Sequence, residues 1–375
     1  MYRAWLDGKK EEGMQMKYYM PVRVYDEKNC VCSHAEDISA LGKRALIVTG
    51  KQSAVLNGSL DDVTDVLRHN GTDYRIFSEV EENPSTETVF AARDRFIPEN
   101  IDFVIGIGGG SPMDAAKAIA LALKHPEADL EYLYDKSADP SALPVVCIPT
   151  TCGTGSEVTG VSVLTRHDKK TKISMVHRVY PVLALIDGKY LKSAPHTLIV
   201  NSAVDALSHL YESVLNAKAD DYVRMTAQAG LKLWAGCKDV LTGDKQADER
   251  DHEKLMRAST FAGMSIAGSG TSLPHALSYI LTYDLGMEHG KAVGYFLPGF
   301  LNAAPADERD ELLFMSGFGG IDDFISFTDR VLGKQDIART ELDKTFNAVV
   351  SNRAKMRSAS FEVDETILKR IVYFK

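Results

Sequence analysis

Long apolar runs and positive charge are both scarce in this sequence. No stretch reaches the roughly 18 uncharged apolar residues that a membrane-spanning helix needs. Residues 1–19 carry charges and lack the apolar core of a secretory signal, so we expect no leader peptide, and Met14, Met16 or Met20 is an alternative start. Lysine and arginine number 43 against 52 aspartate and glutamate, giving a net charge of −9, which argues against a general nucleic-acid binder.

Cysteine is also rare. The five cysteines are odd in number and irregular in spacing, and Cys30 and Cys32 stand too close together for a zinc knuckle. We therefore expect reduced thiols in a cytoplasmic protein that has no membrane or nucleic-acid partner. The remaining composition, 45% apolar and 25% charged over 375 residues, is that of a globular chain with enough length for two domains.

The first half of the chain alternates two kinds of pattern. Continuous apolar runs predict buried strands at residues 44–49, 102–107 and 144–148, because parallel strands that are covered on both faces are apolar throughout. Residues 73–77 predict a further strand. Helical patterns fall between them at residues 60–69, 86–96 and 111–124. This alternation predicts a doubly wound α/β domain with a parallel sheet.

The pattern then changes twice. Residues 159–187 predict hairpin-like strands with a polar turn at residues 168–170. Beyond residue 187 no strand pattern follows, and helical periodicity occupies residues 201–215, 221–235, 251–267, 274–281 and 322–331. We place a domain boundary near residue 190, with an α/β domain at residues 1–190 and an all-α domain at residues 191–375.

Two glycine-rich loops follow predicted strands. Residues 106–114 (GIGGGSPMD) lead into a helix, so backbone amides and the helix N-terminus favour a pyrophosphate there, with Ser111 as the predicted N-cap and Asp114 in the first turn. Residues 149–157 (PTTCGTGSE) offer hydroxyls and amides after another strand. The plainer interpretation is a tight turn and a polar loop, and the GxGxxG fingerprint is absent. Two such loops at strand ends of one sheet favour a dinucleotide.

Side chains of the kind that bind metals stand in the helical half. Asp205 and His209 are four residues apart and share a helix face, and His275 and His289 follow in apolar surroundings. A single histidine on a helix is more often packed or solvated than a ligand, but an unpaired imidazole in such surroundings is costly. One carboxylate with three imidazoles suits Fe²⁺ or Zn²⁺.

Five motifs in this order resemble the iron-containing (group III) alcohol dehydrogenase family. They are GGGSPMDAAK at 108–117, PTTCGTGSE at 149–157, DALSH at 205–209, HALSY at 275–279 and HGK at 289–291. The resemblance runs from about Met20 to the C-terminus. It implies a dehydroquinate-synthase-like fold, with a nucleotide-binding α/β domain, a helical domain and a metal in the cleft between them.

The resemblance also implies roles for individual residues. Asp205, His209, His275 and His289 would hold the metal. The implied coenzyme is NAD or NADP, and its binding residues are Gly108, Gly109, Gly110, Ser111 and Asp114 toward the pyrophosphate, Thr150, Thr151 and Thr154 toward the nicotinamide, and Lys172 near the ribose. A homodimer or higher homo-oligomer is the implied assembly.

Two positions depart from the family pattern. Tyr279 stands where many members carry a further histidine, so a proton path through an imidazole is in doubt; the tyrosine would donate through its phenol, orient substrate or only form the wall. Gly50 stands where NAD-preferring relatives carry an aspartate after the strand, with Ser53 close behind it. Without that carboxylate, NADP becomes possible and NAD is not excluded.

The implied activity is reduction of a small aldehyde or oxidation of an alcohol by hydride transfer with the nicotinamide, while the metal supplies Lewis acidity. Anionic aldehydes such as sulfoacetaldehyde or phosphonoacetaldehyde are among the candidate substrates. A glycerol-dehydrogenase-like polyol oxidation, a dehydroquinate-synthase-like lyase, and a metal- or nucleotide-binding protein without activity are the alternatives. Asp205 favours the dehydrogenase over the lyase, in which a glutamate normally takes that position.

Overall fold

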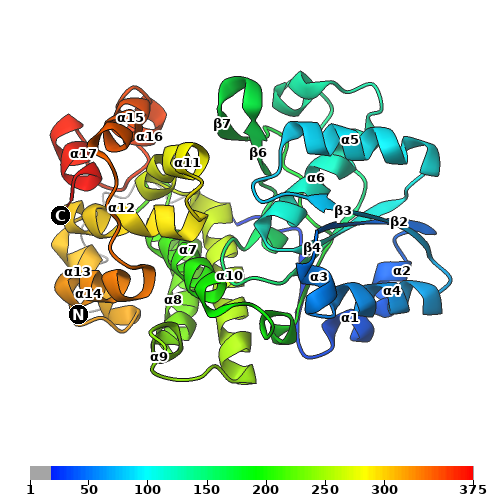
Figure 1. The fold of residues 1–375 in the computed structure, drawn as a ribbon, viewed down its shortest axis with the longest axis horizontal. Coiled ribbons are helices and arrows are strands. Elements are labelled where there is room, and N and C mark those ends of the chain that lie inside the picture. Colours follow the sequence, from blue (N-terminus) through cyan, green and yellow to red (C-terminus); the bar gives the residue numbers. More distant parts are fainter. Residues whose placement is uncertain (1–17, 375) are drawn as a thin grey trace.

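The computed structural model describes residues 18–374 and divides them into two parts (Figure 1). The strands lie in one part, and the other is built of helices alone, as predicted. The prediction about a leader peptide and an alternative start falls largely outside the described residues. None of the helices that the structure describes is long and apolar enough to cross a membrane.

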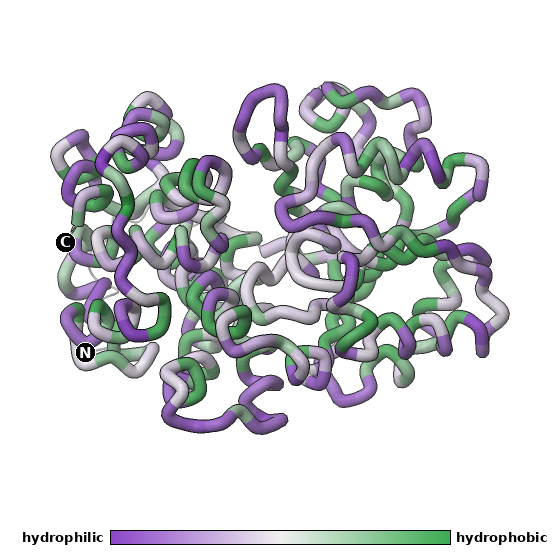
Figure 2. The backbone as a smooth tube through the Cα atoms, in the orientation of Figure 1, coloured by the Kyte–Doolittle hydropathy of each residue, from purple (hydrophilic) through white to green (hydrophobic). Residues whose placement is uncertain are grey.

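A six-stranded parallel sheet forms the centre of the α/β part, with the strand order β1-β8-β5-β4-β2-β3. Its central strands are apolar along their length because helices cover both faces; Leu46 pairs with Val104, which pairs with Val145. Figure 2 shows these strands as a hydrophobic band. The strands are β1 (Arg23–Asp26), β2 (Arg44–Gly50), β3 (Asp73–Val80), β4 (Phe103–Gly108), β5 (Val145–Pro149) and β8 (Leu183–Ile186).

Helices on the two faces of the sheet build two separate cores. Ile47 and Ile105 pack on one side with Val63 and Leu67 of α4, while Leu46 and Val104 pack on the other with α5 and α6. This arrangement confirms the doubly wound fold. The helices of this part are α1 (Cys30–Ser33), α2 (Ala35–Ser39), α3 (Ser53–Leu56), α4 (Ser59–His69), α5 (Thr86–Phe96) and α6 (Gly110–Lys124), with short 3₁₀ turns at Ile97–Glu99 and Leu130–Tyr134.

The hairpin-like region divides into two different structures. Strands β6 (Val163–Arg166) and β7 (Thr171–Ser174) form the predicted antiparallel hairpin, and His167–Lys169 makes its turn. The last strand, β8, was expected in the same hairpin and instead joins the parallel sheet between β1 and β5. Its residues 183–186 are apolar on both faces, which suits a buried parallel strand better than a hairpin.

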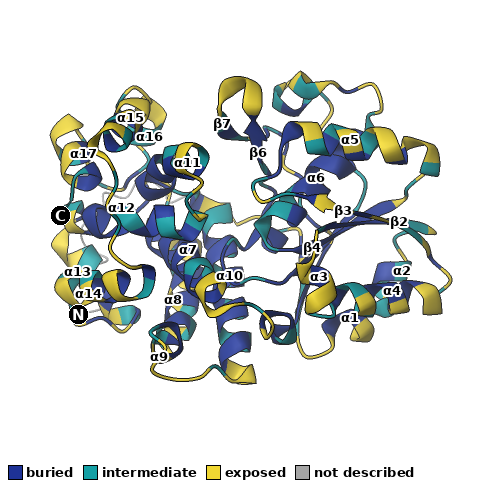
Figure 3. Ribbon diagram, in the orientation of Figure 1, coloured by how far each residue is buried: buried dark blue, intermediate teal, exposed yellow. Residues whose placement is uncertain are grey.

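The helical part is arranged around α7 (His196–Val214), which contacts α8, α10 and α12 and is buried without a break from Ala203 to Val214 (Figure 3). All five predicted helices are present, within a few residues at each end. The remaining helices are α8 (Asp221–Ala235), α9 (Lys238–Leu241), α10 (Glu249–Ser269), α11 (Leu273–Leu285), α12 (His289–Ala303), α13 (Ala306–Met315), α14 (Ile321–Leu332), α15 (Arg339–Val350), α16 (Arg353–Met356) and α17 (Glu365–Val372). The boundary near residue 190 stays a prediction.

Helix α12 was not predicted, and its sequence explains why. It contains Gly290, Gly294, Gly299 and Pro298, residues with poor helix propensity. Tertiary packing overrides that propensity: a Cβ on Gly290 would lie 1.9 Å from the carbonyl oxygen of Asn201 in α7. The glycines therefore permit close approach of two helices, which local sequence patterns do not reveal.

Candidate metal centre and nucleotide cleft

One large cleft, of about 790 Å³, lies where the sheet meets the helical part. The loops after β2, β4 and β5 form one wall, and α7, α11 and α12 contribute to the other. Ligands of open α/β sheets bind at the carboxyl ends of the strands, which is where this cleft opens.

Three helices bring the predicted metal ligands together. Asp205 lies on α7, His275 in the first turn of α11 and His289 at the first position of α12. The Asp205 Oδ1 atom is 3.3 Å from His275 Nε2 and 3.7 Å from His289 Nε2. Each of the three residues offers a ligand atom within 4.8 Å of the others, so one ion could contact all three.

His209 lies beside this group on α7, one turn after Asp205. Its Nε2 is 3.9 Å from Asp205 Oδ1, and its ring stacks on His275 at 4.4 Å between centroids. Its Nδ1 is 3.2 Å from the carbonyl oxygen of Gly153, which fixes the ring with Nε2 toward the carboxylate. Its place as a fourth ligand stays a prediction.

Unpartnered polar atoms show that these residues fit a cation. Asp205 Oδ1, His275 Nε2 and His289 Nδ1 are buried and have no hydrogen-bond partner. Such atoms are costly in a folded protein unless an ion or ligand satisfies them. Burial opposes ionisation of Asp205, but the three imidazoles outweigh it and lower the pKa of its carboxyl group, which keeps an anionic ligand in place. A carboxylate with imidazole nitrogens suits Fe²⁺ or Zn²⁺.

A buried glutamate behind His275 escaped the sequence analysis. Glu212 Oε1 accepts hydrogen bonds from His275 Nδ1 at 2.5 Å and from Ser208 Oγ at 2.6 Å, while its Oε2 accepts from the backbone of Ser272 at 2.7 Å. Carboxylates of this kind fix the tautomer of a ligating histidine. The spacing held a clue, because Glu212 follows Asp205 by seven residues and shares its helix face.

Glu212 also decides the charge of His275. Burial alone would lower the pKa of this imidazole, but the Glu212 carboxylate reverses the effect and raises it to about 9. His289, which lacks such a partner and has a side chain 27% exposed, shifts the other way because burial lowers its pKa.

The two glycine loops pack against each other at the ends of β4 and β5. A Cβ on Gly109 would lie 3.1 Å from Thr151 Oγ1, and one on Gly110 would lie 2.7 Å from Thr154 Cγ2. Gly108 has φ +147°, a backbone conformation that side chains disfavour. The residues of both loops that make these contacts, Gly109, Gly110, Thr151 and Thr154, line the cleft. Backbone amides at the N-terminus of α6 are therefore accessible from it.

The predicted N-cap of α6 is wrong. Gly109 occupies the cap position, and Ser111 lies inside the first turn, where its Oγ accepts a hydrogen bond from the backbone of Asn83 at 3.0 Å. The helix begins at Gly110, two residues before the start that a serine cap at position 111 would give. Ser111 nevertheless lines the cleft, as predicted for a coenzyme-binding residue.

Asp114 lines the cleft, but both oxygens of its carboxylate accept hydrogen bonds from other segments of the protein. Its Oδ1 accepts from Ser156 Oγ at 2.6 Å, and its Oδ2 accepts from the Val163 backbone at 2.8 Å. It thus joins α6 to the second glycine loop and to the hairpin. Gly108 and Thr150 are not among the residues that line the cleft; the Thr150 backbone donates to the Gly108 carbonyl at 2.9 Å.

The other predicted residues all line the cleft. Gly50 and Ser53 lie after β2, and Lys172 on β7 donates to Asn83 Oδ1 at 2.6 Å. Burial lowers the pKa of Lys172 to about 8. Tyr279 lies over His289 with 6.5 Å between ring centroids, and burial raises the pKa of its phenol to about 12.

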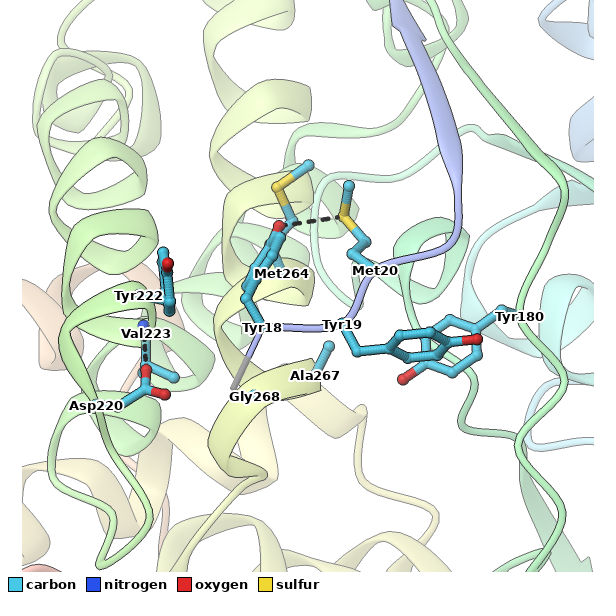
Figure 4. A pocket seen from close by; sticks show the side chains of 10 residues that line it. All are labelled: Tyr18, Tyr19, Met20, Tyr180, Asp220, Tyr222, Val223, Met264, Ala267 and Gly268. Atoms are coloured by element: carbon cyan, nitrogen blue, oxygen red, sulfur yellow. Dashed lines mark hydrogen bonds between the residues drawn. The ribbon is translucent and has the colours of Figure 1, made fainter. Parts of the chain in front are cut away.

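A second pocket, of about 260 Å³, lies where the first described residues cross α8 and α10 (Figure 4). Tyr18 packs on Tyr222 at 5.3 Å and Tyr19 on Tyr180 at 5.6 Å between centroids. Among the described residues that line this pocket, Asp220 is the only carboxylate, and it caps α8. These residues include no group of metal ligands and none of the residues that line the cleft. All five cysteines, Cys30, Cys32, Cys147, Cys152 and Cys237, are free.

Comparison with known proteins agrees with this geometry. Residues 21–188 match the family model described as iron-containing alcohol dehydrogenase, and residues 199–313 match that of the C-terminal part of the same family. The chain belongs to the iron-containing alcohol dehydrogenase family. An iron-containing alcohol dehydrogenase from Thermotoga maritima is 36% identical with a TM-score of 0.87, and the match covers 95% of this chain and 98% of that one.

Curated relatives are more distant. Aldehyde-alcohol dehydrogenase 2 of Entamoeba histolytica is 32% identical over 75% of this chain, which spans about a third (33%) of that protein's length. The 1,3-propanediol dehydrogenase of Klebsiella pneumoniae is 32% identical over 68% of this chain and 67% of its own length. A sulfoacetaldehyde reductase from Bifidobacterium kashiwanohense, 24% identical over 96% of this chain and 99% of that one with a TM-score of 0.84, shares the fold.

Proposed function

We propose that this protein interconverts a small alcohol and its aldehyde with NAD(P), at a divalent ion held by Asp205, His209, His275 and His289. One observation carries the proposal: the buried, unpartnered Oδ1 of Asp205 and Nε2 of His275 lie beside His289 Nε2, in a cleft whose other wall is made of two glycine loops. A metal site and a phosphate site in one cleft are what metal-assisted hydride transfer requires.

The protein's own residues bind and orient the reactants. Backbone amides at Gly109 and Gly110, at the N-terminus of α6, would bind the pyrophosphate. Thr151 and Thr154 would contact the nicotinamide side, and Lys172 would donate to the ribose. An ion in the cluster would supply Lewis-acid polarisation of the substrate oxygen.

Tyr279 would act as a hydrogen-bond donor toward the substrate. Because burial raises the pKa of its phenol to about 12, the group keeps its proton at neutral pH. A neutral phenol beside His289 donates to an oxygen but does not accept a proton. We therefore assign Tyr279 to orientation of the substrate, in the place where many family members carry a histidine.

Acceptance of NADPH alongside NADH is part of the proposal. Gly50 ends β2 with no carboxylate to repel a 2′-phosphate. We expect reduction of small aldehydes, charged ones such as sulfoacetaldehyde and phosphonoacetaldehyde included. A homodimer or higher homo-oligomer in the cytoplasm is the expected form, and light scattering after gel filtration measures the assembly.

Absorbance of the reduced nicotinamide tests the proposal directly. Metal-stripped protein is reloaded with Fe²⁺ or Zn²⁺ and assayed with a panel of small aldehydes, with NADH and NADPH in parallel. We expect turnover that depends on metal, and His275→Ala should lose both turnover and bound metal. Full activity of His275→Ala with metal retained would refute the metal site. Glycerol oxidation without aldehyde reduction, or lyase activity alone, would replace the proposed reaction.

A further inference from the structure

Three basic side chains line the helical wall of the same cleft. Lys218 follows α7, Lys355 lies on α16, and Arg357 comes just after it. In Figure 1, α16 lies at the outer edge of the helical part beside α15, on the opposite side of the molecule from β2, the strand that Gly50 ends. The helix that carries Lys355 is therefore remote from the strand end where the adenosine of the coenzyme is expected.

No counter-charge neutralises these cations. Among residues 18–374, none of the three side chains forms an ion pair or a hydrogen bond with a carboxylate. Burial lowers the pKa of the Lys355 ammonium; the Glu212 carboxylate opposes that shift, and the Lys218 charge adds to it. Lys218 and Arg357 are exposed to solvent, whereas Lys355 is half-buried near Lys218 and forms no ion pair in the described part of the chain, because the nearby Glu212 carboxylate already accepts from His275. An anionic ligand would supply the negative charge that the Lys355 ammonium lacks.

Hydrogen bonds tie this wall to the metal centre. The Ser358 carbonyl accepts from the backbone of Ala217 at 2.9 Å, and its Oγ is 3.0 Å from Ser272 Oγ. Ser272 is the N-cap of α11, three residues before His275, and its own amide donates to Glu212. The cationic wall is thus fixed to the same helix end that positions a metal ligand.

We propose that Lys218, Lys355 and Arg357 form an anion subsite for the carboxylate, phosphonate or sulfonate of a short anionic aldehyde or alcohol. The proposal rests on the proposed function, because it assigns the end of the substrate that lies away from the reacting carbon. Guanidinium and ammonium groups bind such oxyanions through charge-assisted hydrogen bonds. The coenzyme's pyrophosphate has its own site in the glycine loops on the opposite wall.

Paired substrates test the subsite. The ratio of kcat/KM for phosphonoacetaldehyde and succinic semialdehyde to that for propanal and butanal is measured with the metal-loaded, full-length protein. We expect the ratio to favour the charged aldehydes and to fall by roughly 10- to 100-fold in the double variant Lys355→Met/Arg357→Met, since a hydrogen bond to a charged group is lost at each position. Arg353→Met, on the same helix but outside the cleft, should leave the ratio unchanged.

Calorimetry with phosphonoacetate, which cannot be reduced, separates this proposal from the reaction. Saturable binding of phosphonoacetate that the double variant loses supports the subsite. If the same protein turns over no aldehyde, the proposed function is refuted and the subsite is not. Turnover of neutral aldehydes without preference for charged ones, together with no phosphonoacetate binding, overturns the subsite. A raised KM for NADPH with an unchanged aldehyde ratio would also overturn it, since the cations would then serve the coenzyme.

Discussion

Replacement of Glu212 by glutamine tests whether the residue behind a metal ligand tunes the site. The two carboxylate oxygens of Glu212 accept from different donors, Oε1 from Ser208 and His275 Nδ1, and Oε2 from backbone N–H groups of Ser272 and His275. A glutamine must point its NH₂ group at one set. If the NH₂ group of the glutamine faced the backbone amides of Ser272 and His275, hydrogen-bond donors would face each other. Facing His275, the NH₂ group would force Nδ1 to accept and move the proton to Nε2, the nitrogen that faces Asp205 and the ion.

Either orientation weakens metal binding. Loss of such a partner typically costs roughly 10- to 100-fold in metal affinity, which is about 1.4 to 2.8 kcal/mol. We expect Glu212→Gln to raise the dissociation constant for Zn²⁺ by that factor in a competition titration with a chelator, with a parallel fall in turnover at limiting metal.

Asp251→Asn is the matched control. Asp251 is also a buried carboxylate on a helix, but it belongs to the capping box of α10 and pairs with Lys245, away from the metal group. Its replacement should lower the melting temperature of metal-free protein and leave metal affinity unchanged. If Glu212→Gln behaves in the same way, with wild-type affinity for the ion, the reasoning about the His275 tautomer is wrong.

Three further changes probe other parts of the molecule. Gly50→Asp meets only the Val80 carbonyl oxygen at 3.6 Å, so the variant should fold and lower the NADPH-to-NADH ratio of kcat/KM by roughly 10-fold through repulsion of the 2′-phosphate; an unchanged ratio would remove Gly50 from the coenzyme site. The lowered pKa of Lys172, about 8, means that between pH 8 and its usual value near 10.5 the unfolded chain holds a proton that the folded chain has lost. The free energy of unfolding should therefore rise with pH in that window, by up to about 3 kcal/mol, and Lys172→Met should flatten the curve measured by denaturant titration; equal slopes would contradict the shift. Gly290→Ala forces α12 away from α7 and should cost at least about 1 to 3 kcal/mol and reduce bound metal, measured by thermal melting and metal analysis; wild-type values would show that the helices can separate without moving His289.

Features that depend on local sequence patterns could be predicted, whereas features that depend on contacts between distant segments could not. Local patterns suffice for strands such as β2 and β4, because their apolar runs reflect burial on both faces. They also place Asp205 and His209 on one helix face. Placing β8 in the sheet and α12 beside α7 requires contacts between distant segments. The role of Glu212 has the same character, because its partners Ser272 and His275 lie 60 and 63 residues further along the chain.

Close contacts between distant segments also connect the candidate metal centre to the second glycine loop. A Cβ on Gly153, in the second glycine loop, would lie 3.0 Å from the Ser202 carbonyl oxygen and 3.2 Å from Asp205 Oδ2, so this loop rests directly on α7 beside the metal ligand. On another side of the same turn, Gly290 rests on Asn201. One turn of α7 is therefore held by the second glycine loop and by the helix that carries His289. Because Asp205 lies on this turn, we expect a ligand that moves the loop to shift Asp205 against His275 and His289.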